Sequence, residues 1–348
     1  MNKQILTAGN RELFRRTPDD SFESLDALWQ HCQRQKSESQ DHWERPESLL
    51  PVVVDNRLEL GVRDGSAYRL NSWSFSQLCQ LAGVSKDTVN RLTPDTAAKV
   101  FDETMPRTGK PLQLHAQGTL ARSVHAASYT RLHNIELLSI VREFATDFQP
   151  PQRAGGEETT RGGTGLYCGE QDMFCFLVDP TGWTEIDGEA FAPGFFLWNS
   201  EVGKRSVGIQ TFWFQAICRN HIVWDAVEVI DFSRKHTANV GEAVGEIRRL
   251  IHRLVERRDE RRDRFAEVLA KAMRASLGTD EEEVAKVLAR HGVTRALSKE
   301  ALRIARQSGR FTIFSVVDAL TRLSGQIVNA GDRTEADAAA SGLLALAK

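Results

Sequence analysis

The chain contains 348 residues, of which 41% are hydrophobic and 26% are charged. Its formal net charge is -2 at pH 7, which excludes a globally basic protein, so any polyanion has to bind at a local patch. No apolar run reaches the roughly 20 residues of a membrane span, and the first residues lack the apolar core of a signal peptide. We therefore expect a cytoplasmic globular protein that makes no contact with a membrane.

Residues 1–50 are polar and favour helix. Thr17 followed by Pro18 is typical of a helix start, because proline fits the first helical position. The charged residues 31–47 predict a mobile connection. Residues 51–60 then predict a hairpin of two strands that turns at Asp55 and Asn56.

Residues 75–92 are similar to the helix-turn-helix of bacterial repressors. Gly83 stands at the turn, where the backbone needs a positive φ, and Ser85 would cap the second helix. In a DNA reader, Lys86, Asn90 and Arg91 would face the major groove. The same pattern also packs two helices without any contact with DNA, so both interpretations stay open.

The middle of the chain predicts strands around one helix and one glycine-rich segment. Strands are expected over residues 112–124, followed by an amphipathic helix from Ile135 to about Phe148. Residues 153–165 carry five glycines and no large apolar residue, which predicts a flexible surface loop. With Arg153 and Arg161 in it, such a loop would favour a phosphate if it closes over a ligand.

The richest aromatic and β-branched run of the chain lies at residues 191–224. A hairpin is expected before it, with strands at 173–178 and 183–186 and a turn between them. Within the run, residues 201–205 predict a turn between two strands. Phe195 and Leu197 alternate at period two, as do Phe212 and Phe214, so each strand should bury one face.

Helices dominate from Thr237 onward. One amphipathic helix is expected from about Val244 to Leu277, followed by three more that are separated by Gly292 and Gly309. The first helix carries many arginines among five acids, a pattern typical of a solvated face with internal ion pairs. Together these elements predict an α+β protein, with an antiparallel sheet core and packed helices, followed by a helical C-terminal region. The predicted boundaries are 1–50, 51–236 and 237–348.

The sequence predicts no metal centre and no cofactor. The histidines are scattered, and the five cysteines are widely spaced, which is typical of structural thiols. The main enzymatic alternative is a metal-dependent nuclease, whose metal ions would bind four carboxylates at turns and strand ends: Asp172, Asp179, Glu185 and Glu201. No hydrolase, dinucleotide or kinase motif is present, so whether the protein is an enzyme stays open, with binding favoured over catalysis.

Three elements of the sequence carry a resemblance. They are Ser-Tyr-Thr-Arg-Leu-x-Asn-x-Glu-Leu-Leu at 128–138, Phe-x-Trp-Asn-Ser-Glu-Val-Gly-x-x-Ser at 196–206 and Cys-Arg-Asn-His-Ile-Val at 218–223. Together they resemble the phage/plasmid-like protein family defined by domain of unknown function 932. The resemblance implies a passenger of prophages, plasmids or other mobile genetic elements. It implies no catalytic residue.

The mobile-element context favours a DNA-binding protein, with single-stranded DNA preferred over duplex, that binds or anneals single strands in replication or DNA recombination. Such a protein would combine basic residues along the phosphates with aromatic side chains that stack on bases. The expected contacts are seven cations: Arg122, Arg131, Arg153, Arg161, Lys204, Arg205 and Arg219. The alternatives are the helix-turn-helix regulator and the metal-dependent nuclease, and a homo-oligomer is compatible with each.

Overall fold

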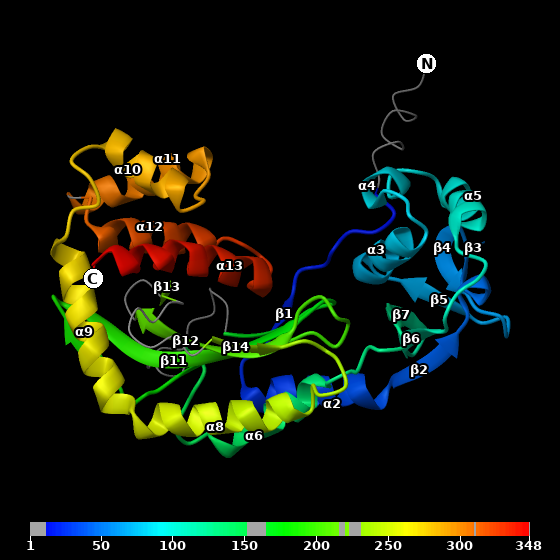
Figure 1. The fold of residues 1–348 in the computed structure, drawn as a ribbon, viewed down its shortest axis with the longest axis horizontal. Helices are drawn as coiled ribbons and strands as arrows, with labels where there is room; N and C mark the ends of the chain where they lie inside the picture. Colours follow the sequence, from blue (N-terminus) through cyan, green and yellow to red (C-terminus); the bar gives the residue numbers. More distant parts are fainter. Residues whose placement is uncertain (1–11, 152–164, 216–219, 223–230, 310, 348) are drawn as a thin grey trace.

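The computed structural model describes residues 12–151, 165–215, 220–222, 231–309 and 311–347. It confirms the predicted α+β class, with sheets in the first two thirds of the chain and helices at the C-terminal end. The described strands form two sheets rather than one. Figure 1 shows the two sheets in separate halves of the molecule, joined by the long helix α2 (Leu25–Ser37) and strand β2.

Sheet B lies in the half formed by residues 39–126. Its strand order is β2-β6-β7-β5-β4-β3, and all neighbours are antiparallel except β5 and β7. Its strands are β2 (Ser39–Glu44), β3 (Leu50–Val54), β4 (Arg57–Gly61), β5 (Ala67–Leu70), β6 (Leu112–Gln117) and β7 (Leu120–Ala126). The hairpin predicted at residues 51–60 is confirmed, because Asp55 and Asn56 take positive φ angles of 46° and 60° between β3 and β4.

Three helices cover one face of sheet B. They are α3 (Ser72–Leu81), α4 (Lys86–Val89) and α5 (Pro94–Thr104). Phe75 from α3 and Phe101 from α5 are fully buried against the sheet, where they pack with Leu60 and Leu114. Asn71 starts α3 with a capping box, since its side chain and that of Ser74 bond each other's backbone amides.

Sheet A lies in the other half and follows the order β1-β8-β9-β11-β12-β13, with β10 paired to β11 and β14 to β12. All its pairs are antiparallel. The strands are β1 (Asp20–Ser21), β8 (Leu166–Cys168), β9 (Met173–Val178), β10 (Thr184–Ile186), β11 (Glu189–Asn199), β12 (Val207–Gln215), β13 (Asn220–Ile222) and β14 (Asp231–Arg234).

The central strands of sheet A bury both faces, whereas the sequence predicted one. Phe195 and Leu197 face α2, α6 (Asn134–Glu143) and α8 (Glu242–Glu256), which lie below the sheet in Figure 1. Phe196 and Phe212 face the opposite way and pack with residues of α13 (Ala330–Ser341). Alternate residues of these strands therefore face two different cores. Because helices cover both faces of the sheet, nearly every position is apolar.

The C-terminal helices curve around one end of sheet A. The helix predicted from Val244 to Leu277 is two helices, α8 and α9 (Arg258–Arg274), which meet at Arg257. The remaining helices are α10 (Glu281–Arg290), α11 (Arg295–Ala305) and α12 (Ile313–Ser324), as the glycine punctuation predicted. Gly292 and Gly309 end α10 and the α11 segment with φ angles of 79° and 83°, which glycine adopts without strain.

Two N-terminal predictions are wrong. The helix expected at Thr17 begins instead at Leu25, where the Ser24 side chain accepts the amide of Ala27. The connection expected at residues 31–47 is the end of α2 followed by β2, because β2 finds a partner in β6. The predicted boundaries at residues 50 and 236 stay a prediction.

The predicted hairpin at residues 173–186 is also wrong in its pairing. Strand β9 pairs with β8 and β11, and β10 returns to pair with β11. A local turn at Asp179 does occur, since its carboxylate accepts the backbone amide of Thr181 at 2.8 Å. Local turn chemistry was visible in the sequence, but the choice of strand partner depends on residues further along the chain.

Within the described residues, no helix combines the length and apolar character that a membrane crossing requires.

We expect Trp213→Ala to lower the free energy of unfolding by about 3–5 kcal/mol. The fully buried Trp213 ring on β12 stacks on Phe265 of α9, with ring centroids 3.9 Å apart, so its loss leaves a cavity between the sheet and the C-terminal helices. Urea unfolding measures the change. Trp43→Ala is the matched control, because the Trp43 side chain is 57% exposed and its loss should change stability by less than about 0.5 kcal/mol. Equal effects of the two variants would contradict this packing.

Candidate functional site at the β11–β12 loop

The loop between β11 and β12, residues 200–206, contacts sheet B, the start of α6 and the C-terminal helix α13. Ser200 is buried, its hydroxyl donates to the carbonyl of Gln171, and it accepts the Lys204 amide at 2.8 Å. Gly203 has a φ angle of 73°, and a Cβ atom there would lie 2.7 Å from the His125 ring. A hydrogen bond within the loop and close packing on His125 of sheet B therefore fix the loop. The turn predicted at 201–205 is confirmed.

Glu201 is the most constrained side chain of the loop. It is buried, and its carboxylate accepts Nη1 of Arg122 from sheet B at 2.8 Å. Its other oxygen accepts the backbone amide of Asn134 at 2.8 Å, which is an otherwise unpaired donor at the start of α6. Burial alone would raise the pKa of Glu201, but His133, Arg122 and the Asn134 amide together lower it well below its usual range. Glu201 is therefore a buried carboxylate that joins the two sheets.

A second ion pair extends this cluster into sheet B. Arg131 donates to the backbone carbonyl of Glu201 and lies 3.1 Å from the carboxylate of Asp41 on β2. Asp41 also contacts Nδ1 of His115 at 2.9 Å. Burial raises the pKa of Asp41, but the His115 hydrogen bond and the Arg131 charge outweigh it and lower the pKa to about 2. We call these residues the Glu201 cluster: Asp41, His115, Arg122, Arg131, His133, Asn134 and Glu201.

Two of the three segments that carry the sequence resemblance meet in this cluster, and the third, residues 218–223, is described only at residues 220–222. Asn199, before the loop, donates its side-chain amide to the Leu132 carbonyl at 2.9 Å and to the Asn134 side chain at 2.8 Å. The Tyr129 hydroxyl contacts the carbonyl oxygens of Ser200 and Glu201 at 3.1 and 3.0 Å. Residues 128–134 and 199–203, which belong to two separate motifs in the sequence, thus contact each other in the fold.

Three aromatic rings stack beside the cluster. The rings of His125 and Tyr129 are parallel within 10° and 3.8 Å apart, and His236 lies 5.4 Å from Tyr129 on the other side. Burial, and then the charge of Arg131, lowers the pKa of His125 to about 3. Burial likewise lowers the pKa of His115 to about 4. These imidazoles are therefore neutral at pH 7, where His125 packs on Tyr129 and His115 keeps its hydrogen bond to Asp41.

The other side of the loop faces the C-terminal helix α13. Nε of Arg205 lies 2.6 Å from the buried Asp172 carboxylate, and its Nη1 lies 2.6 Å from Glu335 of α13. Arg16, from the N-terminal segment, lies 3.6 Å from Asp172. One loop thus binds Arg122 and Arg131 through Glu201, and α13 through Arg205.

Both cations of the loop lie over aromatic rings. Nζ of Lys204 is 5.4 Å from the centre of the Trp73 ring, and Cζ of Arg205 is 5.6 Å from that of Phe174. The Trp73 indole is itself fixed, because its Nε1 donates to the Val202 carbonyl at 2.8 Å. Cation–ring contacts of this length are favourable and hold the charge beside a flat apolar surface.

The predicted nucleic-acid contacts fall into three sets. Arg122 and Arg131 lie inside the Glu201 cluster, where carboxylates already neutralise them. The second set, Lys204 and Arg205, lies on the β11–β12 loop. The third set lies outside the described residues: Arg153, Arg161 and Arg219. Nucleic-acid binding by all seven stays a prediction.

The residues of the helix-turn-helix interpretation serve local packing. Helix α4 is a single turn of four residues, so the second helix is shorter than the sequence predicted. The Asn90 side chain is buried and exchanges hydrogen bonds with the backbone of Phe14 at 2.8 and 2.9 Å. Lys86 donates to the Ser72 hydroxyl, and Arg91 donates to the Asp87 carbonyl. The amide of Asn90 is thus directed into the protein.

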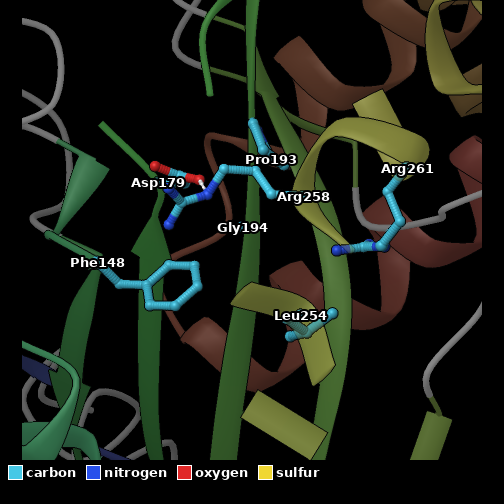
Figure 2. Close-up of a pocket in the computed structure, with 7 residues that line it drawn as sticks. All are labelled: Phe148, Asp179, Pro193, Gly194, Leu254, Arg258 and Arg261. Atoms are coloured by element: carbon cyan, nitrogen blue, oxygen red, sulfur yellow. Dashed lines mark ion pairs between the residues drawn. The ribbon is translucent and has the colours of Figure 1, made fainter. Parts of the chain in front are cut away.

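The four carboxylates of the nuclease interpretation occupy different environments. Asp172, Asp179 and Glu201 each pair with a different arginine, and Glu185 is an exposed residue of β10. Figure 2 shows the ion pair of Asp179 with Arg258 of α9, beside a cavity of about 10 Å³. That volume is at the lower limit for one water molecule. Among the described residues, no three histidines, cysteines or acids are arranged to hold a metal ion.

A family model described as Domain of unknown function (DUF932) matches residues 121–322. The chain belongs to the DUF932 family. The match begins within β7 and ends within α12, so it includes Arg122, Glu201 and the whole β11–β12 loop. Asp41, Trp73 and Glu335, which contact this loop or its cluster, lie outside it. No curated protein and no solved structure matches this DUF932 chain.

Sequence reasoning missed the partners that lie outside the family match. Trp73 and Asp41 were not singled out, because a lone tryptophan in a helix and a lone acid in a charged segment carry no local signal. The sequence predicts that Glu201 lies in a turn and, in the nuclease interpretation, that it binds a metal ion. The available signal was a single acid shortly after the apolar run 195–198, since a buried acid needs a buried cation.

We expect Glu201→Gln to lower the free energy of unfolding by about 3–5 kcal/mol, because it leaves Arg122 buried without a counter-charge. Chemical denaturation measures this loss. The matched control is Glu136→Gln, which breaks an exposed pair with Lys36 and should cost less than about 1 kcal/mol. In the double variant Arg122→Met with Glu201→Gln, part of the loss should be recovered. Additive losses would show that the two side chains are not coupled.

We expect His125→Phe to protect the protein against acid. The unfolded chain protonates His125 near its ordinary pKa of 6.5, whereas the folded chain stays neutral until about pH 3. The contribution of His125 to the free energy of unfolding is therefore fully present above pH 6.5 and decreases as the pH drops towards 3. Phenylalanine keeps the stack on Tyr129 but does not titrate. Between about pH 7.5 and 5, the variant should gain up to about 2 kcal/mol relative to the wild type. Parallel pH profiles of unfolding would contradict this expectation.

Proposed function

We propose that this protein binds single-stranded nucleic acid, with DNA preferred, on the surface that carries the β11–β12 loop. The observation that supports the proposal is that Lys204 and Arg205 lie over the rings of Trp73 and Phe174. Surfaces that bind single strands combine cations for the phosphates with aromatic rings on which bases stack. Here one loop supplies the two cations, and the rings come from α3 and β9.

The two cations have different roles in this proposal. The Lys204 side chain is exposed, and among the described residues its contact is an aromatic ring rather than a carboxylate. It can receive a phosphate without losing an ion pair. Arg205 is held by Asp172 and Glu335, so a phosphate has to displace the exposed Glu335. The net charge of -2 makes the attraction local, so binding should weaken steeply as salt rises.

The proposal includes a cellular context. The resemblance of residues 128–138 and 196–206 to phage/plasmid-like proteins supports a role in the replication or recombination of a mobile genetic element. Such a protein would act in the cytoplasm, where these processes take place. Assembly into a homo-oligomer would place several loops along one strand and raise the affinity through multivalency.

The proposal is tested by fluorescence anisotropy with a labelled single strand of about 16 nucleotides and the matching duplex. We expect tighter binding to the single strand between about 50 and 200 mM salt. Lys204→Gln should weaken binding and lower the slope of log K against log salt by about 0.7, the contribution of one phosphate contact on a single strand.

Lys286→Gln is the matched control. It removes an exposed lysine that pairs with Glu282 on α10, so the salt slope should stay at the wild-type value. Absence of binding at the lowest salt, tighter binding to one duplex sequence, or Mg²⁺-dependent cleavage of the strand would each contradict the proposal. A salt slope that Lys204→Gln leaves unchanged would remove the loop from the binding surface.

A further inference from the structure

A cavity of about 340 Å³ lies beside the loop, between sheet A and α13. Its apolar wall consists of Phe174 from β9 and of Phe196 and Trp198 from β11. Figure 1 shows α13 across this face of the sheet, and Ala330 and Ala338 of that helix pack with the same rings. The volume is at the lower end of ordinary small-molecule sites, which suits a ligand of nucleoside size.

The aromatic wall presents a flat ring surface. Trp198 lies opposite Gly208 of β12, and a Cβ atom at Gly208 would lie 2.3 Å from the Trp198 ring. The indole therefore lies over the glycine backbone, next to Phe196 at 5.3 Å between ring centroids. Trp198 is half-buried, whereas Phe174 and Phe196 are buried. A planar ligand can stack on the accessible part of the Trp198 ring.

Polar groups surround this wall. Arg205 lies so close to α13 that a Cβ atom at Gly331 would meet its guanidinium at 2.4 Å. Glu335, which pairs with Arg205, has a largely exposed side chain. Gln210 stands opposite Phe196 in the register of β11 and β12, and it lines the cavity. Among the described residues, no hydrogen bond engages the Gln210 side-chain amide, so it can pair with a ligand.

We infer that this cavity binds one nucleobase, stacked on Trp198, and prefers a base that carries an exocyclic amino group. The inference rests on the proposed function where the base belongs to a strand, and it names the part of the strand that enters the protein. Adenine, cytosine and guanine offer amino hydrogens, which the Glu335 carboxylate and the Gln210 carbonyl accept. Thymine and uracil have no amino group, and the single N3–H that they offer is flanked by two carbonyl oxygens, which a carboxylate repels.

The position of the cations agrees with this orientation. Arg205 lines the cavity and Lys204 precedes it on the loop, so a base in the cavity leaves its sugar and phosphate near both charges. A free nucleotide presents the same base and phosphate as a strand does. The chemistry of the site therefore covers both sources, and the experiment has to separate them.

The stacking part of the inference is tested with Trp198→Leu and Trp198→Phe. We expect Trp198→Leu to weaken binding of a single strand about 5- to 150-fold, the range for losing one stacked base, and Trp198→Phe to restore most of the affinity. Thermal unfolding shows whether each variant is folded. Trp43→Ala, which removes an exposed tryptophan of the edge strand β2 that does not line the cavity, should bind as the wild type does. Wild-type affinity of a folded Trp198→Leu would overturn the inference.

The selectivity part is tested with Gln210→Leu and three homopolymers of equal length. The wild type should bind oligo-dA and oligo-dC more tightly than oligo-dT, and Gln210→Leu should reduce this difference while it leaves binding to oligo-dT unchanged. Equal binding of the three homopolymers by the wild type would overturn the selectivity. So would an undiminished preference in Gln210→Leu.

The free nucleotides AMP, CMP and UMP separate this inference from the proposed function. If strands bind and Trp198→Leu has no effect, the inference fails while the proposed function stands. If AMP binds with the same dependence on Trp198 and Gln210 but no strand binds, the cavity is a nucleotide site and the proposed function fails. If neither strands nor free nucleotides bind the wild type, both fail.

Discussion

The buried ion pair between Arg122 and Glu201 is the interaction on which the arrangement of this molecule depends. It joins residues 79 positions apart in the sequence and connects sheet B to the loop between the two longest strands of sheet A. Glu201 also accepts the first amide of α6, so the same carboxylate fixes a helix on the other side. Two charges removed from water are tolerated only when every oxygen has a donor, and here each does.

The loop is held on two sides because it carries residues of opposite charge, Glu201 on one side and Arg205 on the other. Glu201 binds Arg122 and Arg131, whereas Arg205 binds Asp172 and Glu335 of α13. The Gly203 turn lies between them and permits the close approach of the His125 ring. Packing, charge pairing and the aromatic stack around Tyr129 thus converge on seven consecutive residues. The site lies where sheet B, sheet A and α13 meet, rather than at the end of a single sheet.

Much of the local structure could be predicted from the sequence, because it depends on nearby residues. The turn at 201–205, the hairpin at Asp55 and the helices separated by Gly292 follow from backbone preference and period. Strand partners could not be predicted, since β10 pairs with a strand that follows it rather than with β9. Burial of Asn90 depends on Phe14, a residue 76 positions away, so no window around the helix-turn-helix pattern contained that information. The candidate site was found through its loop, and its partners Asp41 and Trp73 were missed for the same reason.

The boundary of the family match divides the cavity beside the loop. The sheet wall, with Phe174, Trp198 and Gln210, lies inside residues 121–322, whereas all of α13 lies beyond them. The family model therefore covers the sheet wall of this cavity and ends before the wall that α13 forms. A substitution of the exposed Glu335 would therefore change this wall at little risk to the fold, because the buried contacts of Glu201 lie on the opposite side of the loop.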